Sequence, residues 1–87
     1  MRIRVRRTGG FAGIERTAEV DTSAVPDAGE WHTLAGMVLE EGESGGRGVP
    51  DGFSYEITIG DATVRCADPR LTDAQRALIT RVLKEGA

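Results

Sequence analysis

Residues 53–66 read Phe-Ser-Tyr-Glu-Ile-Thr-Ile-Gly-Asp-Ala-Thr-Val-Arg-Cys, which is the pattern of two strands joined by a short turn. Its first half alternates apolar and polar residues, which is typical of a strand with one buried face. Gly60-Asp61 is a two-residue turn signal. Pairing across this turn predicts an antiparallel hairpin in which Ile59 faces Ala62, Ile57 faces Val64, Tyr55 faces Cys66 and Glu56 faces Arg65.

A second alternating pattern covers residues 2–6 and 14–20, on either side of a glycine-rich interruption. Ile3 and Val5 share one face, and the arginines at 2, 4 and 6 share the other. We expect a hairpin that pairs Arg7 with Ile14, Arg6 with Glu15, Arg4 with Thr17, Ile3 with Ala18 and Arg2 with Glu19. Arg16 then lies beside Val5, which indicates that the inner face near the loop is partly open.

Each hairpin precedes an amphipathic helix. Asp27 with Glu30, and Thr72 with Gln75, have the spacing of capping boxes. The first apolar stripe is predicted to end at Gly42 and the second near Gly86. The stripes consist of Trp31, Leu34, Ala35, Val38 and Leu39, and of Leu71, Ala74, Leu78, Ile79, Val82 and Leu83.

The predicted fold class is α+β with ββαββα order, in which two helices pack on one face of a four-stranded antiparallel sheet. Residues 1–87 are expected to form a single domain, because neither half has enough apolar surface to fold alone. Residues 43–52, rich in glycine, are predicted to be a flexible connection between the halves.

The bulk composition excludes several classes of partner. The net charge is −3 and the pI about 5.1, so nucleic acid is not an expected partner. No apolar run has the length of a secretory signal or a membrane span, which predicts a cytoplasmic protein without a membrane partner. The free protein is expected to be a monomer.

Groups that carry catalysis are scarce in the sequence. His32 and Cys66 are the single residues of their types, so neither a metal site nor any other cofactor is expected, and we predict that the chain is not an enzyme. His32 is interpreted as a helix-surface residue. Cys66, on the apolar side of its strand, is interpreted as a small core residue.

Phe11 is unusual for its position, because turn tips are normally polar. It stands in Gly9-Gly10-Phe11-Ala12-Gly13-Ile14. One interpretation is a projecting apolar prong that meets a partner. The other is a residue folded back over Arg16 or the sheet edge.

Three segments together resemble the emfourin family, small protein inhibitors of thermolysin-like zinc metallopeptidases named after the protealysin inhibitor. They are Thr8-Gly9-Gly10-Phe11-Ala12-Gly13-Ile14, Pro50-Asp51-Gly52-Phe53-Ser54-Tyr55 and Leu71-Thr72-Asp73-Ala74-Gln75-Arg76. The glycine-rich Phe motif is the most specific of the three. The resemblance implies a tight non-covalent inhibitor and no catalytic residue.

Where the resemblance and the Phe11 pattern agree, we expect the prong to block the substrate cleft of a thermolysin-like metallopeptidase. The expected partner-binding residues are Gly9, Gly10, Phe11, Ala12, Gly13, Ile14, Asp51 and Phe53. Two other functions stay open: a regulatory interaction domain that docks on a non-peptidase partner through its open sheet face, and a domain that binds a small ligand or RNA.

Overall fold

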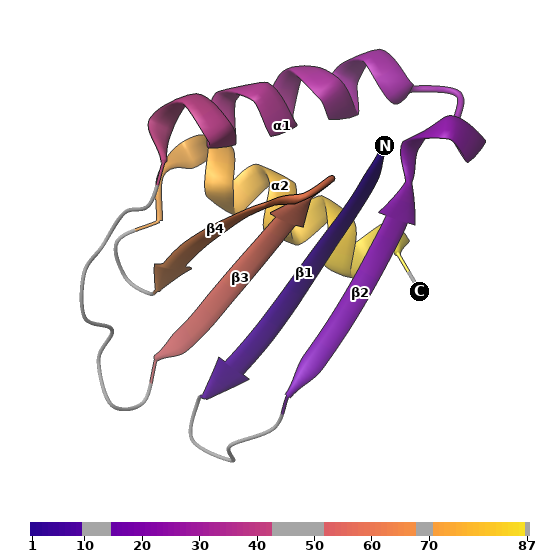
Figure 1. The fold of residues 1–87 in the computed structure, drawn as a ribbon. Coiled ribbons are helices and arrows are strands. Elements are labelled where there is room, and N and C mark those ends of the chain that lie inside the picture. Colours follow the sequence, from indigo (N-terminus) through magenta and orange to yellow (C-terminus); the bar gives the residue numbers. More distant parts are fainter. Residues whose placement is uncertain (10–14, 43–51, 68–70, 87) are drawn as a thin grey trace.

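The computed structural model describes residues 1–9, 15–42, 52–67 and 71–86. In chain order the elements are β1 Arg2–Gly9, β2 Arg16–Asp21, the short 3-10 helix η1 Thr22–Ala24, α1 Ala28–Glu41, β3 Phe53–Ile59, β4 Ala62–Ala67 and α2 Asp73–Glu85. The predicted ββαββα order and α+β class are confirmed. Figure 1 shows the sheet as one layer and both helices as a second layer across it.

The described strands form a single antiparallel sheet in the order β2-β1-β3-β4. The pairing of β1 with β3 joins the two halves of the chain at the centre of the sheet. In the β3–β4 hairpin, Ile59 faces Ala62, Ile57 faces Val64, Tyr55 faces Cys66 and Glu56 faces Arg65, so the predicted register is confirmed.

The predicted register of the first hairpin is wrong by two residues. Arg7 lies opposite Arg16 rather than Ile14, and Val5 lies opposite Ala18. A shift of two keeps every side chain on its predicted face, and it brings apolar residues together on the buried side. The expected ion pairs still form, because arginine reaches diagonal neighbours: Arg6 lies 2.7 Å from Glu15, and Arg2 lies 2.8 Å from Glu19.

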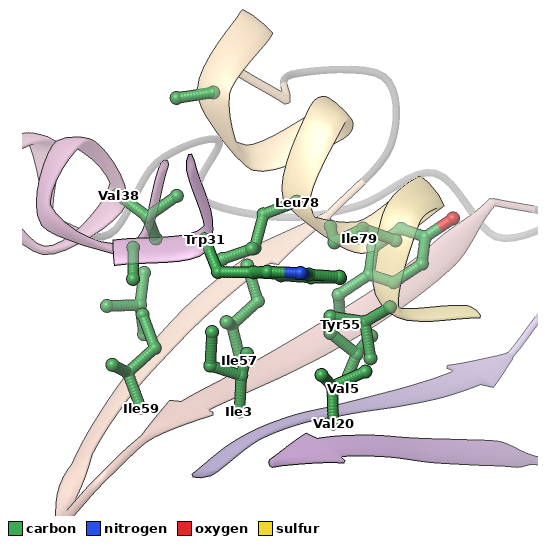
Figure 2. Close-up of a cluster of buried hydrophobic side chains, with 14 of the residues drawn as sticks. Ile3, Val5, Val20, Trp31, Val38, Tyr55, Ile57, Ile59, Leu78 and Ile79 are labelled. Atoms are coloured by element: carbon green, nitrogen blue, oxygen red, sulfur yellow. The ribbon is translucent and has the colours of Figure 1, made fainter. Parts of the chain in front are cut away.

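The core fills the space between the helices and one face of the sheet. Figure 2 shows Trp31 of α1 between the strand residues Ile3 and Ile57 and the α2 residue Leu78. All four are fully buried. Cys66 is buried as predicted, at 5% exposure, while His32 is exposed on α1 as predicted.

The two predicted capping boxes have different outcomes. Thr72 and Gln75 form theirs at the start of α2. Asp27 is the N-cap of α1 but makes no capping hydrogen bond. Its carboxylate instead accepts from Trp31 Nε1 at 3.1 Å and pairs with Arg81 of α2, so it joins the two helices.

The apolar stripe of α1 is narrower than predicted. Trp31, Ala35 and Val38 are buried, but Leu39 is 41% exposed and does not belong to the core. The helix ends at Gly42 as predicted. None of the helices in the described ranges is long and apolar enough to cross a membrane.

Candidate partner-binding site

Two of the predicted partner-binding residues lie in the described part of the chain, and the sheet brings them together. Gly9, the last residue of β1, is directly opposite Phe53, the first residue of β3. Gly10, Phe11, Ala12, Gly13, Ile14 and Asp51 lie outside the described residues. The sequence motifs that contain Phe11 and Asp51 therefore both adjoin the same end of the sheet, the end farther from α1 in Figure 1.

The backbone at Gly9 requires glycine for two reasons. Its φ is +90°, a conformation that L side chains rarely adopt. A Cβ atom there would lie 3.0 Å from the carbonyl oxygen of Gly52, on the facing segment. The close approach of the two backbone segments at this point thus depends on the absence of a side chain at Gly9.

On the helix-facing side of the sheet, Phe53 is covered by an arginine. The guanidinium carbon of Arg7 lies 4.4 Å from the centre of the Phe53 ring. The ring of Tyr55 lies 6.4 Å from that of Phe53 at an interplanar angle of 54°. Phe53 and Arg7 are both half-buried, so this end of the inner face is less enclosed than the core around Trp31.

Arg16 lies directly across from Arg7, on the same face of the sheet. Its Nη2 donates to the carbonyl oxygen of Leu83 at 2.5 Å, in the last turn of α2. This contact ties the start of β2 to a helix end, where unpaired carbonyl groups favour a cation. The end of the sheet where β1 finishes and β2 begins, called the loop end below, therefore carries two arginines at opposed positions of its inner face.

The opposite, outer face is charged and open to solvent, and its arginines have carboxylate partners. Arg6 contacts Glu15 at 2.7 Å and Glu56 at 3.5 Å. The hydrogen bond to Glu15 raises the pKa of the Arg6 guanidinium above its ordinary value. On β1, the outer-face Arg6 thus has carboxylate partners, whereas the inner-face Arg7 contacts an aromatic ring.

A hollow of about 220 Å³ lies on the outer face, lined by Arg2, Arg4, Glu19, Thr58 and Gly60. Arg2 pairs with Glu19 there. Arg4 is exposed and makes no ion pair with any residue in the described ranges. The hollow is lined mainly by charged and polar side chains and is open to solvent rather than enclosed.

The described residues do not assemble a metal centre, since no three of their His, Cys, Asp and Glu side chains are grouped to hold an ion. His32 contacts Thr22 Oγ1 through Nε2 at 3.0 Å, and this hydroxyl also donates to the carbonyl of Met1. His32 is thus part of the contact that holds the N-terminal strand.

Sequence reasoning missed the pair formed by Arg7 and Arg16. The signal was present, because each arginine continues the apolar alternation of its strand on the inner side. Arg16 was the one residue that did not suit the predicted register. The error of two residues in that register hid its position opposite Arg7.

The comparisons with known proteins agree with the resemblance found in the sequence. The family model described as Emfourin matches residues 5–83, which is nearly the whole of the 87-residue chain. Neither the curated proteins nor the solved structures gave a match.

Proposed function

The chain belongs to the emfourin family, and from this premise we propose that it inhibits thermolysin-like zinc metallopeptidases without forming a covalent bond. Family membership is consistent with such a role, and it suggests a peptidase as the partner. Emfourins are inhibitor proteins rather than enzymes. The proposed inhibitor is a cytoplasmic monomer when free.

The observation that carries the proposal is the position of Gly9 opposite Phe53. It brings the described parts of the two most distinctive emfourin-like motifs to one end of the sheet, although they are far apart in the sequence. Inhibitory loops bind tightly when a scaffold holds them, because ordering loose side chains costs about 0.5–1.5 kcal/mol each. Strands β1 and β3 supply that scaffold.

In the proposed mechanism, Phe11 enters the pocket that binds the apolar side chain just after the cleaved bond. Pockets of this kind are concave and mostly apolar, and a glycine-flanked aromatic side chain suits them. The loop excludes substrate from the cleft and contributes no zinc ligand. Gly10, Ala12, Gly13, Ile14 and Asp51 are the proposed neighbours of Phe11 at the interface.

The test is a titration of the purified protein against several thermolysin-like enzymes, with a peptide substrate as the reporter. We expect stoichiometric loss of activity for at least one of them. A serine and a cysteine peptidase serve as controls and should keep their activity. Full activity of the whole metallopeptidase panel at a molar excess of the protein would refute the proposal.

A second candidate function is a regulatory domain that docks on a non-peptidase partner through the outer sheet face. The hollow beside Arg4 favours it, because this arginine has no carboxylate partner among the described residues. Replacing Arg4 by Gln separates the two functions. The variant should inhibit the peptidase normally if the loop end is the interface.

A further inference from the structure

Two arginines occupy opposed positions on neighbouring strands where β1 ends and β2 begins. Arg7 and Arg16 face each other directly across β1 and β2, and like charges at opposed positions destabilise a sheet. Both lie beside the candidate interface, since Arg7 covers Phe53 and is two residues from Gly9, and Arg16 follows Ile14 by two residues.

Within the described ranges, neither arginine contacts a carboxylate. On the outer face of the sheet, Glu15 and Glu56 contact Arg6, and Glu19 contacts Arg2. Arg7 Nε is shielded from solvent and has no hydrogen-bond partner in the described structure. The chain as a whole has a charge of −3, yet the described inner face carries two uncompensated positive charges here.

Both guanidinium groups are held in place before any partner arrives. The Phe53 ring supports that of Arg7 at 4.4 Å, and the Leu83 carbonyl holds that of Arg16 at 2.5 Å. An arginine that is already oriented loses less entropy when it binds, and its planar group matches a carboxylate. Arg7 and Arg16 are therefore two oriented cations on neighbouring strands, which suits them to recognise an anion.

We propose that Arg7 and Arg16 together receive a carboxylate side chain of the peptidase, next to the cleft that the Phe11 loop enters. This inference rests on the proposed function and adds the chemistry of the partner surface. A carboxylate of the partner there offsets the positive charge that the inner face carries at these two positions. The N–H groups that Arg7 and Arg16 do not use within the described structure supply the hydrogen bonds.

The test compares Arg7→Gln, Arg16→Gln and the double variant with the unaltered protein against a peptidase that the latter inhibits. The matched control is Arg4→Gln, which removes the same charge from the other face of β1. We expect each inner-face variant to raise the inhibition constant about tenfold or more, as for loss of a hydrogen bond to a charged group. Arg4→Gln should stay within about twofold.

Two further measurements make the test specific. Inhibition by the unaltered protein should weaken as salt rises, and the double variant should lose most of this salt dependence. Arg7→Lys keeps the positive charge but lacks the planar guanidinium group. Its inhibition constant should therefore lie between that of Arg7→Gln and that of the unaltered protein. Melting curves establish that each variant is folded before its inhibition constant is used.

The outcomes separate this inference from the function on which it rests. If the unaltered protein inhibits no thermolysin-like peptidase, the proposed function itself fails. If it does inhibit one, and the folded double variant has the same inhibition constant and salt dependence, the arginine pair has no role in binding. A loss in Arg4→Gln as large as in Arg7→Gln would overturn the assignment to the inner face.

Discussion

Gly9 and Phe53 lie directly opposite each other at the end of the β1–β3 pair, 44 positions apart in the sequence. The backbone at Gly9 has a φ of +90° and passes so close to Gly52 that a Cβ would lie 3.0 Å from its carbonyl oxygen. This contact sets the distance between the two segments that lead to the proposed inhibitory loops. A small substitution at Gly9 should therefore disturb both of these segments.

Gly9→Ala tests this relationship. The substitution forces a methyl group into a positive-φ position, which costs about 1–2 kcal/mol, and it adds the contact with Gly52. We expect a lower free energy of unfolding in urea and weaker inhibition. The matched control is Gly36→Ala on the exposed side of α1, where nothing lies within 4 Å of the new methyl group.

The control should change stability in the opposite direction. Alanine in a helix interior is favoured over glycine by about 1 kcal/mol, so Gly36→Ala should raise the free energy of unfolding. Equal effects of the two substitutions would show that Gly9 has no special backbone role.

Cys66→Ser should destabilise the domain. The thiol lies on the buried face opposite Tyr55 and is 5% exposed; a buried thiol behaves as a small apolar group, and a hydroxyl is more costly to remove from water. Cys66→Ala is the control for lost volume, since it removes the sulfur without adding a polar group. In the folded protein, Cys66 should also react slowly with a bulky thiol reagent, and the alkylated protein should still inhibit the peptidase. Rapid labelling of the folded protein would contradict the burial of Cys66.

The second hairpin could be predicted in full because its turn has only two residues. Gly60-Asp61 leaves one register that satisfies both the apolar pairs and the Glu56–Arg65 pair. The first hairpin has a long loop, which does not constrain the register. The predicted and the observed register satisfy its charges equally well, since Arg6 forms its ion pair with Glu15 in the observed register too.

Contacts between the two halves of the chain could not be predicted from local patterns. Asp27 has the spacing of an N-cap, but Arg81, 54 residues later, draws its carboxylate away from the helix end. In the same way, Arg7 meets Phe53 only because β1 pairs with β3. The candidate site was thus found through its sequence motifs, whereas its arginine pair needed the sheet order.

Stability at acid pH should depend on Asp21, which precedes η1. Its carboxylate accepts from Ser23 Oγ at 2.7 Å and from Ser23 N at 3.0 Å. These hydrogen bonds, that of the hydroxyl first, lower the pKa of Asp21 below its ordinary value. A lowered pKa means that Asp21 stabilises the fold above the unfolded pKa and that this contribution is lost as pH falls through the folded one.

We therefore expect Asp21→Asn to lower the melting temperature at neutral pH, and the difference from the unaltered protein to shrink below about pH 4. Ser23→Ala is the matched control, because it removes the hydroxyl and keeps the carboxylate. It should show a smaller difference with the same pH trend. A difference that stays constant from neutral to acid pH would contradict the role of the Asp21 charge.

Phe11→Ala is the direct test of the proposed prong. If Phe11 enters a pocket of the peptidase, its truncation should weaken inhibition by about 2 kcal/mol or more, as at interface hot spots, and leave the melting temperature nearly unchanged. If Phe11 instead packs back on the sheet, truncation should cost about 3–5 kcal/mol of stability. Melting curves and inhibition constants for the same samples distinguish these results.

Phe53→Ala is the matched control, because it removes the other phenylalanine of the chain. Phe53 is half-buried against the core and lies under Arg7, so its truncation should lower the melting temperature clearly. Phe11→Asp adds a further contrast, since an apolar pocket must desolvate the carboxylate whereas an exposed loop accepts it. A large loss of stability in Phe11→Ala, with normal inhibition by the folded fraction, would exclude the prong and leave the rest of the loop end as the interface.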